Sequence, residues 1–139
     1  MSPTVRDVMT ADPVALEAKT SVTEAARKMK ERDIGDVIVL EGDSLCGVVT
    51  DRDIVVRALA EERDPGATKL GDICSREVVT VAPGDDLTTA GDVMRQRAIR
   101  RVPVVEGGRP VGILSMGDLA VERDPNSALG QVSAASPNT

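Results

Sequence analysis

The chain contains no histidine and no aromatic residue: His, Phe, Tyr and Trp are all absent from its 139 residues. The lack of histidine excludes mechanisms that need an imidazole base, and most zinc sites with them. The lack of aromatic rings removes the stacking on which single-stranded nucleic-acid binding depends. The net charge of −6 argues against binding to duplex DNA. We therefore expect no nucleic-acid partner, no metal site and no histidine-based catalysis.

Long apolar runs are also missing. No apolar run approaches the roughly 20 residues of a membrane span, and the N-terminus shows no charged-then-apolar signal pattern. We expect a cytoplasmic protein without a membrane partner. The two cysteines, Cys46 and Cys74, lack a C-x-x-C spacing. We interpret them as small reduced hydrophobic residues, with a redox role as the alternative.

A long internal repeat organises the chain. Residues 5–54 and 70–119 align without a gap at an offset of 65 positions. Identical pairs include Asp7/Asp72, Val14/Val79, Met29/Met94, Gly47/Gly112 and Asp53/Asp118. A repeat of this length indicates a duplicated small domain, since solenoid units are shorter. One copy of about 55 residues is marginal for independent folding, so the pair is the expected fold unit.

Each copy predicts the order strand, helix, strand, strand, helix. In copy one the first helix begins at Thr20-Ser21, and we expect Ser21 to form a capping box with Glu24. Two apolar runs around a Gly-containing turn predict a hairpin in each copy, and Pro103 places its strand at an edge or a bulge. The last helix of copy one is expected to run to about Glu62, and that of copy two to about Glu122. The predicted organisation is 4–64 for copy one, 65–69 for a linker, 70–124 for copy two and 125–139 for a loose tail.

Each copy closes with the pattern Gly-apolar-apolar-Thr/Ser-x-x-Asp, at Gly47–Asp53 and Gly112–Asp118. The strand ends at the hydroxyl residue, and the following helix begins with free N–H groups that favour an anion. The carboxylate one turn later can accept two hydrogen bonds from a vicinal diol such as a ribose. The same pattern is also typical of a helix N-cap, and the sequence leaves both interpretations open.

Two such units in tandem resemble a CBS-domain pair, or Bateman module, over about residues 4–122. The opening strings Asp7-Val8-Met9-Thr10 and Asp72-Ile73-Cys74-Ser75 carry the resemblance together with the closing motifs. It implies an α+β fold in which two βαββα CBS units pack face to face as a pseudo-twofold pair. The chain is similar to small stand-alone bacterial CBS-pair proteins, some of which belong to hypoxia or dormancy responses.

The resemblance also implies two clefts that bind an adenosine compound: AMP, ADP, ATP, NAD or S-adenosylmethionine. The first predicted cleft contains Ser115, Gly117, Asp118, Arg100, Arg101, Met9, Asp12, Val14, Ile34 and Gly35. The second contains Thr50, Arg52, Asp53, Glu77 and Val79. In each, the Asp would hold the ribose. No cofactor is required, and an adenosine nucleotide is the expected ligand.

The two predicted clefts differ in charge. Copy two has Arg100-Arg101 where copy one has Gly35-Asp36. A guanidinium attracts a phosphate that a carboxylate would repel, so the Ser115/Asp118 cleft is predicted to be the better nucleotide site. The alternative for these arginines is a solvated basic helix end.

The sequence is compatible with three functions. The first is a regulatory module in which the adenosine ligand shifts the packing of a homodimer. The second is a ligand-free structural or interaction protein, with an unidentified protein partner, in a stress response. The third, an enzyme, is disfavoured because the sequence offers no nucleophile beside a base.

Overall fold

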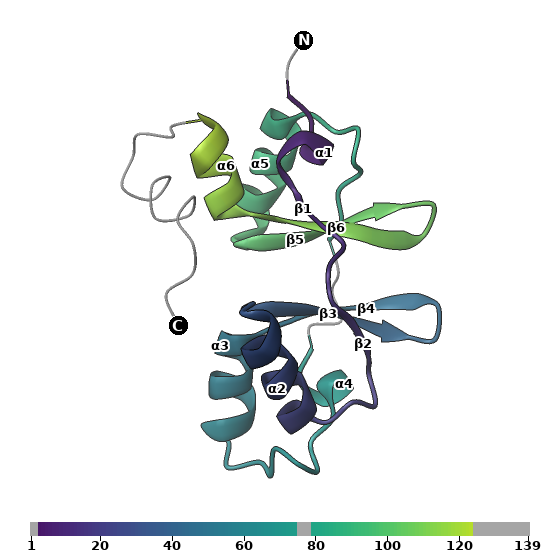
Figure 1. The fold of residues 1–139 in the computed structure, drawn as a ribbon. Helices are drawn as coiled ribbons and strands as arrows, with labels where there is room; N and C mark the ends of the chain where they lie inside the picture. Colours follow the sequence, from purple (N-terminus) through teal and green to yellow (C-terminus); the bar gives the residue numbers. More distant parts are fainter. Residues whose placement is uncertain (1–2, 75–78, 124–139) are drawn as a thin grey trace. The chain divides into compact units, whose positions relative to one another are not determined.

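The computed structural model describes residues 3–74 and 79–123 (Figure 1). The chain divides into two compact units. We call Pro13–Val78 the first-copy unit, and Met1–Asp12 together with Val79–Thr139 the second-copy unit. Both contain helices and a small sheet, which confirms the predicted α+β class.

The first-copy unit has the predicted βαββα order. Its elements are β2 (Ala15–Glu17), α2 (Val22–Arg32), β3 (Asp36–Glu41), β4 (Ser44–Thr50), α3 (Asp51–Asp53), a π-helix η1 (Ile54–Leu59) and α4 (Leu70–Ile73). The sheet order is β2-β3-β4, with β2 parallel to β3 and β3 antiparallel to β4. In the view of Figure 1, the helices lie on one side of this sheet. The apolar stripe of α2 explains this packing, because Val22, Ala25 and Met29 are buried.

The second-copy unit repeats this design with a weaker first strand. Its elements are α1 (Val5–Val8), β1 (Thr10–Ala11), α5 (Leu87–Arg97), β5 (Arg101–Glu106), β6 (Arg109–Ser115) and α6 (Met116–Arg123). The sheet order is β1-β6-β5. The position that corresponds to β2 is reduced to a single parallel bridge between Val81 and Val104.

The two copies exchange their opening segments. The amide of Val5 in α1 donates to the Asp85 carbonyl, and the amide of Leu70 in α4 donates to the Thr20 carbonyl. Thr20 and Asp85 occupy the same column of the repeat. Thus the start of copy one packs on the body of copy two, and the start of copy two packs on the body of copy one. The compact units therefore do not coincide with the repeat boundaries 4–64 and 70–124.

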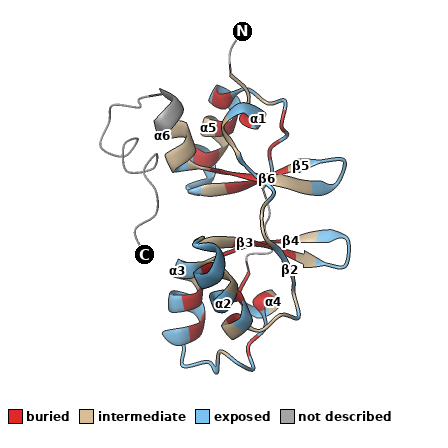
Figure 2. Cartoon of the chain, in the orientation of Figure 1, coloured by how far each residue is buried: buried red, intermediate tan, exposed pale blue. Residues whose placement is uncertain are grey.

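Each unit has its own hydrophobic core, and the buried residues are coloured red in Figure 2. The exchanged segments contribute residues to both cores. Val5 is fully buried in the core of the second-copy unit, while Leu70 and Ile73 are buried in that of the first-copy unit. Burial of a Val, Leu or Ile side chain stabilises a fold by about 1.5–3 kcal/mol, so these short segments contribute to the stability of the unit they join.

Several local predictions can be compared with the structure. The amide of Glu24 donates to Ser21 Oγ at 3.1 Å, so one of the two bonds of the predicted capping box is formed. Pro103 lies in β5, the last strand in the order β1-β6-β5, beside a register shift between Val104 and Val105. The final helix of copy one ends at Leu59, three residues before the predicted Glu62, and its last six residues form the π-helix η1. Within the described part of the chain, no helix is long and apolar enough to cross a membrane.

Candidate functional site

The closing motif of each copy forms a turn from a strand into a helix. In the second-copy unit, the amide of Met116 donates to the Arg100 carbonyl at 2.8 Å. In the first-copy unit, the amide of Asp51 donates to the Gly35 carbonyl at 3.0 Å. These bonds join equivalent positions of the repeat. The hydroxyl residue of each motif therefore lies beside the first residues of the neighbouring strand.

The carboxylates of both motifs cap their own helices. Asp118 Oδ2 accepts from the Ser115 amide at 2.8 Å, and the Asp118 amide donates to Ser115 Oγ at 3.0 Å. Asp53 and Thr50 form the same pair of bonds, at 2.9 and 3.1 Å. The capping interpretation that the sequence left open is thus realised at both positions. The cap of Asp118 uses Oδ2, and both Asp side chains are half-buried.

Outside the closing motifs, two further aspartates make the same contact at the start of a short helix. Asp7 Oδ2 accepts from the Thr4 amide at 2.8 Å in the second-copy unit. Asp72 Oδ2 accepts from the Lys69 amide at 3.0 Å in the first-copy unit. The carboxylate-to-amide bond is therefore a general way in which this chain starts a helix, and it does not by itself indicate a ligand.

The residues opposite the two hydroxyls differ in charge. Arg101 pairs with Ser115 in the register of β5 and β6, while Asp36 pairs with Thr50 in the register of β3 and β4. Arg100 precedes Arg101 and is exposed. The structure thus places a positive charge beside one motif and a negative charge beside the other, at equivalent positions. A phosphate would be favoured more at Gly112–Asp118, the Ser115 motif, than at Gly47–Asp53, the Thr50 motif.

Arg57 connects the Thr50 motif to the exchanged helix α4. Its Nη1 donates to the Ile73 carbonyl at 3.0 Å, and its Nε lies 3.8 Å from Asp53 Oδ1. The sequence did not single out this residue. Its only signal was a basic residue four positions after the acid, a spacing that brings two side chains together on a helix.

The remaining predicted residues are divided between the units. Met9, Asp12 and Val79 belong to the second-copy unit, together with Ser115, Gly117 and Asp118. Val14, Ile34, Gly35 and Arg52 belong to the first-copy unit, together with Thr50 and Asp53. Glu77 lies outside the described residues, as does the predicted tail 125–139.

Met9 lies against the glycine of the closing motif. The strand β1 pairs with β6 so that Thr10 faces Ile113 and Ala11 faces Gly112. A β-carbon at Gly112 would lie 2.6 Å from Met9 Sδ and 2.9 Å from the Thr10 carbonyl oxygen. The absence of a side chain at Gly112 therefore lets the segment Met9–Thr10 lie directly against β6.

A pocket of about 380 Å³ lies elsewhere in the first-copy unit, between β2, the β3–β4 turn and α4. Charged residues of both signs line it, among them Glu17, Lys19, Glu41, Lys69 and Asp72. None of the sequence-predicted site residues lines this pocket. Across residues 3–74 and 79–123, no group of three or more Cys, Asp or Glu side chains could hold a metal ion.

The repeat, the exchanged opening segments and the paired strand-to-helix turns can now be compared with known proteins. The sequence profile of the CBS domain matches twice, at residues 5–59 and 70–123. The chain belongs to the CBS-domain family. The two matches follow the two copies of the repeat, which makes the chain a CBS pair.

Two bacterial relatives cover most of this CBS pair. The CBS domain-containing protein YhcV of Bacillus subtilis is 38% identical over 126 residues, or 91% of this chain and 89% of the relative. Hypoxic response protein 1 of Mycobacterium tuberculosis is 35% identical over 118 residues, or 84% of this chain and 82% of the relative. Both similarities extend across the two CBS copies.

Three solved structures are similar to this CBS pair. The structure of Hypoxic Response Protein I with two coordinated zinc ions has 34% identity and a TM-score of 0.75, and covers 86% of this chain and 98% of that one. A hexameric CBS-CP12 protein from bloom-forming cyanobacteria has 30% identity and a TM-score of 0.81, with coverage of 90% and 74%. The CBS pair of protein MJ0100, in complex with 5′-methylthioadenosine and S-adenosyl-L-methionine, has 26% identity and a TM-score of 0.76, with coverage of 86% and 94%.

Proposed function

We propose that this CBS pair is a cytoplasmic regulatory module that binds an adenosine-containing ligand and acts in a stress response. The observation that carries the proposal is the charge beside the Ser115 motif: a half-buried Asp118 at the start of α6, with Arg101 opposite Ser115 on the neighbouring strand. A ribose phosphate offers a diol that a carboxylate can bind and an anion that a guanidinium attracts, so a site that contains both Asp118 and Arg101 would suit it.

The cap of Asp118 is compatible with this role. Its Oδ2 accepts the Ser115 amide, and Oδ1 can accept from a ribose hydroxyl without breaking that bond. The capped carboxylate is held in one orientation, so a diol would meet an acceptor that is already positioned. By the family resemblance, Met9 and Asp12, which belong to the same unit as Asp118, would lie near the base.

Comparison with relatives supports the ligand class. The MJ0100 CBS pair holds two adenosine compounds, and one close relative carries the name of a hypoxic response protein.

The Thr50 motif is the weaker of the two proposed sites, because Asp36 stands where Arg101 stands in copy two. Arg52, exposed on α3, partly compensates for that charge.

Calorimetry tests the proposal, since the chain has no Tyr or Trp for intrinsic fluorescence. The thermal midpoint is measured with AMP, ADP, ATP, NAD and S-adenosylmethionine. A ligand present at a hundred times its dissociation constant adds about 2.7 kcal/mol to the free energy of unfolding. A raised midpoint with at least one compound supports the proposal. An unchanged midpoint with all five compounds would reject the ligand-binding function and favour the alternative, a ligand-free interaction protein.

The interaction function has its own supporting observation. Three large apolar side chains on η1 are exposed: Val55 by 55%, Val56 by 45% and Leu59 by 53%. Exposed apolar clusters of this kind mark interaction surfaces, and a second copy of the chain is the partner we propose. The hexameric relative is consistent with self-association. Light scattering, which measures the mass of the particle in solution, tests this surface with the variant Leu59→Lys and the exposed control Gln96→Lys. We expect Leu59→Lys to be a monomer and Gln96→Lys to remain a dimer. An unchanged mass in Leu59→Lys would reject this surface.

A further inference from the structure

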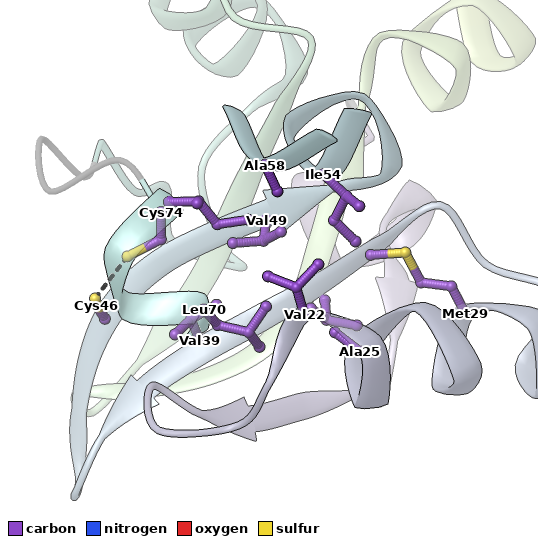
Figure 3. Packing of buried hydrophobic residues seen from close by; sticks show 12 residues of the cluster. Val22, Ala25, Met29, Val39, Cys46, Val49, Ile54, Ala58, Leu70 and Cys74 are labelled. Atoms are coloured by element: carbon purple, nitrogen blue, oxygen red, sulfur yellow. Dashed lines mark hydrogen bonds between the residues drawn. The ribbon is translucent and has the colours of Figure 1, made fainter. Parts of the chain in front are cut away.

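Cys46 and Cys74 lie next to each other in the core of the first-copy unit. Their Sγ atoms are 2.8 Å apart, although 28 positions separate them in the chain. Cys46 is on β4 and Cys74 is the C-cap residue of α4, and Figure 3 shows the two sulfurs facing each other beside Leu70 and Val39. The exposed fractions of the two residues are 6% and 7%. Neither cysteine forms a disulfide in this structure.

We propose that Cys46 and Cys74 are a redox site, a dithiol that a hydroperoxide oxidises to an intramolecular disulfide. The sulfur separation of 2.8 Å needs only a small approach to reach the bonded distance of about 2.05 Å. The two residues come from segments that the exchange between copies brings together. The proposed site is therefore a product of the fold, invisible in the cysteine spacing.

The repeat itself provides the comparison that favours a redox role over simple packing. The corresponding positions of the second-copy unit are Val111 for Cys46 and Met9 for Cys74. Both pack against the core of that unit. The fold thus fills these two positions without sulfhydryl groups in one copy, so packing alone does not require a pair of thiols in the other.

The reaction balances with one equivalent of hydrogen peroxide. One thiolate attacks a peroxide oxygen, the O–O bond breaks, and a sulfenic acid and a hydroxide form. The second thiolate attacks the sulfenic sulfur, forms the S–S bond and displaces a second hydroxide. The two thiol protons convert both hydroxides to water. Two electrons pass from the sulfurs to the peroxide.

Oxidation would tie α4 to β4. The helix α4 has four residues, and local opening of such a short element gives a small oxidant access to buried thiols. Once formed, the bond would close a loop across the first-copy unit and restrict its unfolded state. The Ile73 carbonyl next to Cys74 accepts the bond from Arg57, so the oxidised form would also hold α4 in place beside the Thr50 motif.

The test treats the reduced full-length chain with hydrogen peroxide, and then measures free thiols in denaturant, intact mass and thermal midpoint. We expect both thiols to disappear together, the mass to fall by two hydrogen atoms, and the midpoint to rise by on the order of 10 °C. A thiol reductant should reverse all three changes.

The variants Cys46→Val and Cys74→Met, which copy the residues of the second-copy unit, should show no rise in midpoint after the same treatment. The result in the native chain is interpretable even if a variant fails to fold. Thiols that survive the treatment, a mass that increases by oxygen atoms, or a bond between two chains would each overturn the proposal. The outcome does not depend on whether the protein binds an adenosine compound.

Discussion

Met9 lies so close to Gly112 that no side chain fits at the glycine: an added β-carbon would be 2.6 Å from the Met9 sulfur. The Thr10 carbonyl oxygen, which is backbone and cannot swing away, would be at 2.9 Å. Gly112 is thus what allows the exchanged segment of copy one to pair with β6.

We predict that Gly112→Ala lowers the free energy of unfolding by about 1–3 kcal/mol, because overpacking at this position forces β1 away from β6. Urea unfolding followed by far-ultraviolet circular dichroism measures the change. The matched control is Gly84→Ala in the same unit, where an added β-carbon meets nothing within 4 Å. Equal stability of the two variants would show that the contact with Met9 and Thr10 is dispensable.

Ala98, the C-cap residue of α5, adopts a left-handed backbone conformation with φ of 53°. A non-glycine residue is strained there, and glycine relieves the strain at some cost in chain entropy. We predict that Ala98→Gly raises the free energy of unfolding by about 0.5–1 kcal/mol. Ala90→Gly, at a fully buried position inside the same helix, should lower it by more than about 1 kcal/mol, because a buried methyl is lost in addition to helix propensity. Thermal unfolding compares them, and a loss of stability in Ala98→Gly would contradict the prediction.

Arg57 should stabilise the first-copy unit through the Ile73 carbonyl rather than through Asp53. The 3.8 Å ion pair with Asp53 is weak, because half of the Arg57 side chain is exposed and solvent screens the charges. We predict that Arg57→Gln lowers the free energy of unfolding by about 1 kcal/mol, the contribution of one hydrogen bond. Denaturant unfolding measures the free energies of unfolding of Arg57→Gln and of the control Arg52→Gln, which changes an exposed arginine. Two indistinguishable variants would mean that the bond to Ile73 contributes nothing measurable.

The sequence predicted the elements whose signals are local. The start of α2 at Ser21 followed from a capping residue and an apolar stripe, and the two hairpins followed from apolar runs around Gly-containing turns. The repeat added the equivalence of the Thr50 and Ser115 motifs, which the hydrogen bonds of the two turns reproduce.

The exchange of opening segments had no local signal. The helices α1 and α4 have four residues each, and β1 has two. Such short elements are defined by their partners, and the partner of Thr10 is Ile113, more than a hundred positions away. The π-helix of η1 was missed for a similar reason, because a one-residue change in helical hydrogen bonding leaves no trace in the apolar pattern.

The role of Asp118 could not be decided from its spacing. A carboxylate three residues after a hydroxyl can cap a helix or bind a diol, and both roles have the same sequence pattern. The structure confirms the cap. The ligand stays a prediction, and Asp7, with the same carboxylate-to-amide bond in the same unit, provides the means to separate the two roles.

The most direct test therefore compares the thermal midpoints of the native chain, Asp118→Ala and Asp7→Ala by calorimetry, each with and without the adenosine compounds. Both substitutions remove a cap and should lower the ligand-free midpoint, by a free energy of about 0.5–2 kcal/mol. The account predicts that an adenosine compound raises the midpoint of the native chain and of Asp7→Ala but not that of Asp118→Ala. An equal rise in all three proteins, or no rise in any, would contradict it.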